Sequence, residues 1–111
     1  VPVLINTGTL SFRYCIQAAL AAAESGADIV DIGGVPFSPD TYEPSEAEEI
    51  ELVVPLVEEL TRHSNVAISI DTFRSGTAAA ALSAGAAMIN DTSGLQDPGM
   101  APLVAREGAH I

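Results

Sequence analysis

The sequence predicts an α/β fold in which parallel strands alternate with helices. Short apolar segments alternate with segments whose apolar residues recur at helical spacing, and glycines separate the two kinds of segment. The strand candidates are continuously apolar, as expected when both faces of a sheet are covered. With 111 residues, 48% of them apolar and 17% charged, the chain suits one folded domain over residues 1–111 rather than a disordered segment.

The first strand–helix–strand unit can be read directly from the sequence. Val1–Ile5 is apolar and rich in β-branched residues, which predicts a strand, and Thr7-Gly8-Thr9 interrupts it. An alanine-rich helix is expected over Phe12–Ser25, and Gly26 should end it. The next apolar segment, Ala27–Gly33, predicts the second strand.

A long loop and a second helix follow. Gly33–Pro44 contains two glycines and three prolines, which predicts a loop. Ser45 and Glu48 have the spacing of a capping box, in which each side chain satisfies a backbone N–H at the start of a helix. Pro55 lies inside the apolar repeat of this helix and should kink it. Most glutamates fall within Glu43–Glu59, and we interpret them as a solvated helix face.

The rest of the sequence repeats the same unit, with a glycine ending each helix and a strand following at once. We expect a strand over Val66–Ile70, a helix over Ser75–Ala84, a strand over Ala87–Ile89, a helix over about Pro98–Glu107, and the start of a fifth strand at Ala109–Ile111. About four βα units and the start of strand five suit a partial (β/α)8 TIM barrel with parallel strands, although a doubly wound sheet uses the same unit.

Charge and composition exclude several classes of function. The net charge is −11, with four arginines and no lysine, which argues against nucleic-acid binding and excludes a P-loop or Schiff-base lysine in this chain. No apolar run approaches the ~20 residues of a membrane span, so we expect no membrane association and a cytoplasmic location, with an organelle matrix as the alternative. The one cysteine, Cys15, is expected to be an inert packing residue.

Polar residues stand at the expected carboxyl ends of all four strands. These residues are Asn6, Asp31, Asp71 and Asn90, and Asp91 comes next. Ligands of parallel α/β folds bind outside the carboxyl ends of the strands. Carboxylates and carboxamides there could pair with the edge of a flat heterocycle, so we expect a binding site, although a single strand-end aspartate is often a helix cap or a loop anchor.

Other polar residues suit structural roles. Asp91-Thr92-Ser93-Gly94 and Asp97-Pro98 have the composition of turns and caps, and Asp28 should face solvent at the start of a strand. His63 follows an acidic helix, where a cation complements the helix dipole, and we prefer that role to metal binding. No pattern of the H-x-x-H or C-x-x-C type is present.

Several segments together resemble the dihydropteroate synthase family of pterin-binding TIM barrels. The similar segments are Gly26–Gly34, Ile68–Thr72 and Ile89–Met100, and Asn6 with Ser11-Phe12 resembles the family's first motif. The resemblance extends over nearly the whole chain but covers only the N-terminal half of the family's barrel. It implies a transferase of folate biosynthesis, which condenses 6-hydroxymethyl-7,8-dihydropterin pyrophosphate with para-aminobenzoate and releases dihydropteroate and pyrophosphate.

The resemblance also implies roles for individual residues. Asp71 and Asn90 would bind the pterin edge, and Asp31 would support the floor of the site. Asn6 would lie near a Mg²⁺ ion on the pyrophosphate, where the metal stabilises leaving-group charge. The partners implied are the two small-molecule substrates, and no residue of this chain is assigned as catalytic.

Two segments depart from the family pattern. Gly8–Tyr14 is shorter and lacks the aspartate of the family's first loop, and Val35–Asp40 lacks the threonine and arginine of its second loop. These departures favour a catalytically impaired pterin-binding homologue as one alternative. A pterin-binding domain of a corrinoid methyltransferase and an unrelated α/β binding module are the others. Unpaired strand edges of half a barrel would favour a homodimer, unless the chain is a piece of a longer protein.

Overall fold

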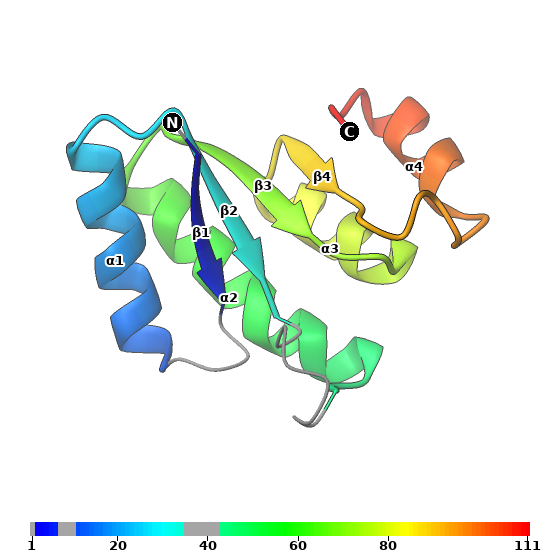
Figure 1. Ribbon diagram of the computed structural model, residues 1–111, viewed down its shortest axis with the longest axis horizontal. Helices are drawn as coiled ribbons and strands as arrows, with labels where there is room; N and C mark the ends of the chain where they lie inside the picture. Colours follow the sequence, from blue (N-terminus) through cyan, green and yellow to red (C-terminus); the bar gives the residue numbers. More distant parts are fainter. Residues whose placement is uncertain (1, 7–10, 35–42) are drawn as a thin grey trace.

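The computed structural model describes residues 2–6, 11–34 and 43–111, and strands alternate with helices throughout them (Figure 1). The expected order of elements is therefore confirmed. The elements are β1 (Pro2–Asn6), α1 (Phe12–Glu24), β2 (Ile29–Gly33), α2 (Glu46–His63), β3 (Ala67–Asp71), α3 (Ser75–Ala84), β4 (Met88–Asn90) and α4 (Met100–Glu107).

The strands of the described residues form one parallel sheet in the order β1-β2-β3-β4, so each strand lies beside the next one in the sequence (Figure 1). The expected start of a fifth strand is present as a single parallel bridge between His110 and Met88. A doubly wound sheet reverses its strand order at a switch point, whereas a TIM barrel keeps the order of the sequence. The observed order is that of a barrel.

The helices begin and end close to where the sequence predicts. The capping box of α2 is present, since the Ser45 Oγ accepts from the Glu48 amide at 3.2 Å and the Ser45 amide donates to Glu48 Oε1 at 3.0 Å. This helix continues through Pro55, and the kink expected there stays a prediction. The expected start of the last helix at Pro98 is wrong. A turn from the Asp97 carbonyl to the Met100 amide, 3.0 Å apart, precedes α4 and delays it to Met100.

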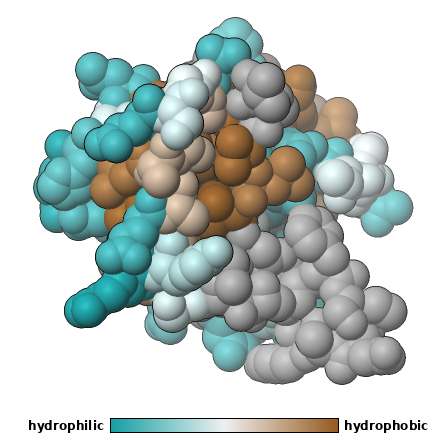
Figure 2. Space-filling model, turned by 60° about the vertical axis from the view of Figure 1, so that its left-hand side comes forward, coloured by the Kyte–Doolittle hydropathy of each residue, from teal (hydrophilic) through white to brown (hydrophobic). Residues whose placement is uncertain are grey.

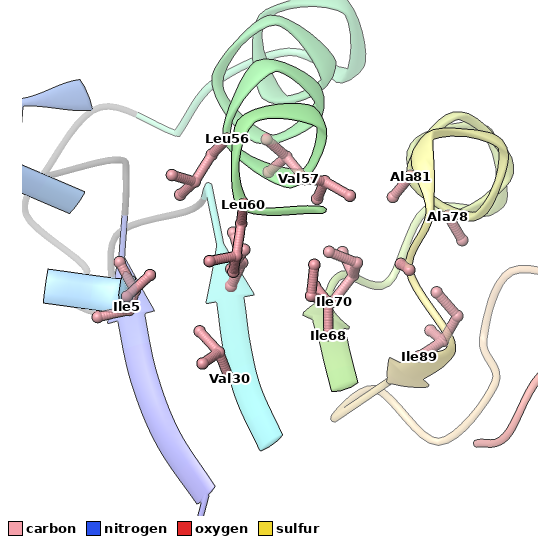
Figure 3. Close-up of a cluster of buried hydrophobic side chains, with 14 of the residues drawn as sticks. Ile5, Val30, Leu56, Val57, Leu60, Ile68, Ile70, Ala78, Ala81 and Ile89 are labelled. Carbon is pink, nitrogen blue, oxygen red and sulfur yellow. The ribbon is translucent and has the colours of Figure 1, made fainter. Parts of the chain in front are cut away.

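The core lies between the sheet and the helices α2 and α3, which cover one face of it (Figure 3). Strand residues of one face meet apolar residues of the two helices, and burial of this surface supplies the main stabilisation of the fold. The labelled core residues are Ile5, Val30, Ile68, Ile70 and Ile89 from the strands, Leu56, Val57 and Leu60 from α2, and Ala78 and Ala81 from α3.

The acidic helix α2 is only partly a solvated surface. The expectation that its glutamates all face solvent is wrong for Glu49, which is completely buried at 0% exposure. Glu49 precedes Val53, Leu56, Val57 and Leu60 by four, seven, eight and eleven residues, so helical spacing places it on the same buried stripe.

The cysteine of α1 is buried, as expected for a packing residue. Cys15 is buried at 0% exposure in α1, and burial raises the pKa of its thiol, which disfavours the reactive thiolate.

One face of the molecule has an apolar area in its centre with hydrophilic side chains around it (Figure 2). Within the described parts of the chain, no helix is both long enough and apolar enough to cross a membrane.

Candidate functional site

The register of the sheet places three of the predicted site residues in one row at its carboxyl edge. Asn6 pairs with Gly33, Gly33 pairs with Asp71, and Asp71 pairs with Asn90. The row therefore brings Asn6, Asp71 and Asn90 to neighbouring strand ends, as expected. The structure describes the backbone of Asn6 but not its side chain.

Asp31 lies one layer below this row. The second strand ends at Gly33, as predicted, but the expectation that Asp31 stands at its carboxyl end is wrong. Ile32 and Gly33 follow Asp31 in the ladder and pair with Ile70 and Asp71. Asp31 itself pairs with Ser69 and lies two positions before Gly33, the last residue of β2. Alternate residues of a strand share a face, so Asp31 still lies on the same face of the sheet as the row above it.

Asp31 and Asn90 are joined across the sheet. The Asn90 Nδ2 donates to Asp31 Oδ2 at 3.4 Å, near the upper limit for a hydrogen bond. Asp31 is buried at 6% exposure, and its other oxygen, Oδ1, has no hydrogen-bond partner among the described residues. A buried acceptor without a partner costs free energy, so a donor group on a bound molecule would be favoured here.

Asp71 is half-buried at the end of β3, and its surroundings are acidic. Burial raises the pKa of its carboxyl, and the nearby charges of Asp31, Glu49 and Asp91 raise it further. Gly33 of the neighbouring strand lies close to Asp71, since a Cβ at Gly33 would be in ordinary van der Waals contact with the Asp71 Cβ, at 3.5 Å. Asp71 is therefore a carboxylate held under unfavourable electrostatic conditions, which a hydrogen-bond donor would relieve.

A hollow of about 410 Å³ opens on this face of the sheet. Its walls are mainly apolar, from Leu4, Met88 and Ile111, and its polar groups come from Asp31 and Asn90. An apolar cavity with a few convergent polar groups suits a small flat ligand. Ser69 also lines the hollow. No site role was predicted for it, because it lies within the apolar segment Ala67–Asp71.

A buried ion pair that was not predicted from the sequence lies beside the row. Glu49 Oε1 accepts from Arg74 Nη1 at 3.2 Å and from Thr77 Oγ1 at 2.7 Å. Arg74 lies in the turn between β3 and α3, and Thr77 lies in the first turn of α3. The position of Glu49 on the apolar stripe of α2 was the one signal in the sequence, but its partner is 25 residues away.

The polar residues expected to have structural roles have them. Asp91 Oδ1 accepts from the Ser93 amide at 2.9 Å, which closes a turn. Asp97 accepts from the Gly99 amide at 2.8 Å and from the Ser75 amide at 2.7 Å, and these hydrogen bonds hold the pKa of its carboxyl below the usual range. Asp97 therefore also caps α3, across 22 residues. His63 pairs with Glu59, with 2.8 Å between Nε2 and Oε1.

The site offers oxygen donors that suit a hard cation, but no preformed cage. Across residues 2–6, 11–34 and 43–111, no group of three or more His, Cys, Asp or Glu side chains is placed to hold a metal ion. Mg²⁺ commonly keeps several waters and takes only one or two protein ligands besides phosphate oxygens. The carboxylate of Asp71, at the carboxyl end of β3, is one oxygen ligand of this kind.

The sequential order of the parallel strands defines the class: an α/β protein with the strand order of a TIM barrel, of which the described residues form a part. The particular family follows from a direct comparison. The chain belongs to the pterin-binding enzyme family, whose model matches residues 5–111.

Individual relatives carry the same family relationship. The chain is 45% identical over 102 residues to a dihydropteroate synthase of Staphylococcus haemolyticus, and this alignment covers 91% of the chain and 38% of the relative. It is 44% identical over 94 residues to a dihydropteroate synthase of Mycobacterium leprae, covering 84% of the chain and 33% of the relative. The chain thus spans between a third and two fifths of the length of these two relatives.

Solved structures agree in fold. A dihydropteroate synthase of Xanthomonas albilineans with 4-aminobenzoic acid matches with a TM-score of 0.88 at 32% identity, covering 97% of the chain and 44% of that structure. A dihydropteroate synthase of Anaplasma phagocytophilum with bound 6-hydroxymethylpterin-monophosphate matches with a TM-score of 0.88 at 31% identity, covering 97% of the chain and 43% of that structure. The chain therefore has the fold of part of a TIM barrel.

Proposed function

We propose that the chain forms the pterin-binding part of a dihydropteroate synthase, a transferase of folate biosynthesis. The reaction condenses 6-hydroxymethyl-7,8-dihydropterin pyrophosphate with para-aminobenzoate. The observation that carries the proposal is the linked polar group at the strand ends. Asp71 and Asn90 share the upper row, and Asn90 is bonded to Asp31 below it, in a chain whose relatives bear this enzyme name.

The pterin ring would be held by complementary hydrogen bonds. The carboxylate of Asp71 and the open Oδ1 of Asp31 can accept from ring N–H and amino groups, and the carboxamide of Asn90 can donate to a ring acceptor as well as accept. Asp31 and Asn90 are already joined, so less side-chain motion is lost when the ring binds. The apolar walls of the hollow would contact the faces of the ring.

The chemical step would depend mainly on positioning. The amine nitrogen of para-aminobenzoate forms a bond to the pterin methylene carbon, while the carbon–oxygen bond to pyrophosphate breaks and pyrophosphate leaves with the electron pair. The nitrogen then releases one proton to solvent, which gives the secondary amine of dihydropteroate. A ring fixed by Asp71 and Asn90 would present the methylene in a constant direction, which raises the fraction of reactive encounters. Mg²⁺, which we propose to bind near Asn6, would stabilise charge on the leaving group.

The first test is ligand binding. A dihydropterin pyrophosphate analogue is titrated with Mg²⁺ into the chain and into Asp71→Ala and Asn90→Ala by calorimetry. We expect each substitution to weaken binding by about tenfold, or roughly 1.4 kcal/mol. The exposed residues Asp28 and Asn65 supply matched controls, Asp28→Ala and Asn65→Ala, which should bind like the parent chain. Equal losses in the controls, or no binding by a folded chain, would contradict the proposal.

The Mg²⁺ proposal has its own measurement. Repeating the titration with and without Mg²⁺ gives the gain in affinity that depends on the metal. Asn6→Ala should reduce this gain while leaving the metal-independent affinity for a pterin without pyrophosphate unchanged. A gain that is the same in Asn6→Ala and the parent chain would place the metal elsewhere.

A catalytically impaired pterin-binding homologue is the second candidate. The sequence of Val35–Asp40, which lies outside the described residues together with residues 7–10, favours it because the family's threonine and arginine are missing. Pterin binding without formation of dihydropteroate would support this candidate. The relatives named above give no support to the methyltransferase alternative, and the cytoplasmic location and the homodimer stay predictions.

A further inference from the structure

A buried ion pair lies directly behind the row of site residues. Glu49 is 0% exposed, and the Arg74 side chain is 19% exposed. Glu49 Oε1 accepts from Arg74 Nη1 and Thr77 Oγ1, while its Oε2 is buried and has no hydrogen-bond partner in the part of the chain that the structure describes. A buried carboxylate is costly when its cationic partner is removed, so this contact constrains both side chains strongly.

Arg74 connects two separate loops through its two terminal nitrogens. While Nη1 contacts Glu49, Nη2 donates to the carbonyl of Pro44 at 2.9 Å. Pro44 belongs to the segment that leads into α2, and Arg74 belongs to the turn that follows β3. The planar fork of arginine presents a separate nitrogen to each acceptor, whereas lysine has one nitrogen for both.

The same turn carries Asp71. Only Thr72 and Phe73 separate Asp71 from Arg74, and the Arg74 amide donates to Thr72 Oγ1 at 3.2 Å, which closes the turn. Thr72 is buried at 2% exposure, and its amide donates to the Asn90 carbonyl at 3.3 Å. A short, hydrogen-bonded turn connects Arg74 to Asp71, so a shift of the Arg74 side chain would also shift the backbone that carries Asp71.

The end of β2 is held by the same pair. A Cβ at Gly34 would lie 3.2 Å from the Glu49 Cγ and 3.1 Å from the Val53 Cγ2, so the backbone after β2 contacts α2 closely at this point. Glu49 thus packs against the exit of β2 and binds the exit of β3. Glu49 therefore links the segments that follow two neighbouring strands, in addition to the backbone pairing of Gly33 with Asp71.

We propose that Glu49 and Arg74 are positioning residues for pterin binding, which hold the β3–α3 turn against the start of α2 and thereby set the place of Asp71 in the site. This inference rests on the proposed function. It adds two residues, neither of which lines the hollow, to those that determine pterin affinity.

The test compares Arg74→Lys with Arg62→Lys, a matched control in an exposed pair with Glu59. Arg74→Lys keeps a cation near Glu49 but loses the second contact to Pro44. We expect the dissociation constant of the dihydropterin pyrophosphate analogue to rise about tenfold in Arg74→Lys and to stay within about twofold in Arg62→Lys. Glu49→Gln keeps the shape of the side chain and should cause a smaller rise of about threefold, with Glu51→Gln, an exposed position of α2, as its control.

Unfolding by urea separates positioning from stability. If the pair had only a structural role, Arg74→Lys and Glu49→Gln would lower the free energy of unfolding, but the folded variants would bind the analogue as tightly as the parent chain. That result would overturn the proposal. If Arg74→Lys does not fold, Glu49→Gln carries the same comparison, and an unchanged dissociation constant in Glu49→Gln would then overturn it.

A measurement without ligand separates this inference from the proposed function. If the parent chain does not bind the pterin analogue, the proposed function fails, and the pair is judged by NMR. The carbon-13 signal of the Asp71 carboxyl and the amide signals of residues 71–74 should move in Arg74→Lys and Glu49→Gln, and should stay in place in Arg62→Lys. Coincident signals in parent and variants would mean that the pair does not position Asp71.

Discussion

At the scale of single residues, the site places carboxylates where the free chain would not favour them. Asp31 is almost completely buried with one open acceptor, and burial together with acidic neighbours raises the pKa of Asp71. Such groups are costly to the folded chain, and a ligand with hydrogen-bond donors removes part of the cost. Binding sites often retain residues that reduce stability for this reason.

This cost predicts the effect of Asp71→Asn. A carboxyl with a raised pKa in the folded state destabilises the fold above that pKa, and the effect disappears as the pH falls toward the usual value of 3.8. Asp71→Asn should therefore raise the free energy of unfolding at neutral pH and have little effect in acid, while it weakens pterin binding. Urea unfolding of both chains as a function of pH checks this, and lower stability of Asp71→Asn at neutral pH would contradict it.

At the scale of elements, glycines and caps determine where helices begin and end. Gly85 and Gly108 follow α3 and α4 with φ angles of 128° and 65°, which residues with side chains rarely adopt. Asp97 caps α3 from a distant loop, and the reciprocal hydrogen bonds of Ser45 and Glu48 start α2. The two caps lie at the starts of α2 and α3, where Glu49 and Arg74 make their contact.

The capping box predicts the effect of Ser45→Ala. Loss of the serine oxygen leaves the Glu48 amide without its acceptor, which typically costs about 1 kcal/mol of stability. Ser83→Ala, at an exposed position of α3, serves as a control and should change the free energy of unfolding by less than about 0.5 kcal/mol. Equal stability of Ser45→Ala and the parent chain in urea would show that the box does not stabilise α2.

Local patterns predict elements well and their three-dimensional partners poorly. Hydrophobic spacing and terminal glycines predicted every described helix and strand, because these signals act within a few residues. The place of Asp31 at the carboxyl end of β2 was predicted wrongly, since an aspartate on a strand can face a hollow without ending the strand. The burial of Glu49 could not be predicted because charged residues are seldom buried, and its partner is close only after folding. The row of Asn6, Asp71 and Asn90 was predictable because parallel strands end at one edge.

At the scale of the whole molecule, negative charge is the dominant property of the surface. The net charge of −11 comes from 15 acidic residues against four arginines. Several exposed ion pairs, such as Arg62 with Glu59, contribute little to stability. Repulsion among the remaining carboxylates opposes the compact state more than it opposes the extended chain.

The charge predicts a dependence on salt. Raising sodium chloride to about 1 M shortens the Debye length to about 3 Å and screens the repulsion, so the free energy of unfolding should increase. Urea unfolding at low and high sodium chloride checks this. A decrease with salt would mean that the attractive pairs outweigh the repulsion.

The sequential order of the sheet also bears on how the chain acquires its structure during synthesis. Among the described strands, β2, β3 and β4 each lie beside the strand made just before them, so each has a partner that has already left the ribosome. A new strand can dock on the edge left by its predecessor once its helix has been made, and the earlier edge is covered at the same moment. The arrangement therefore permits the sheet to grow from one end. Each added strand covers one exposed edge and leaves one new edge, so the number of edges open to wrong pairing does not increase.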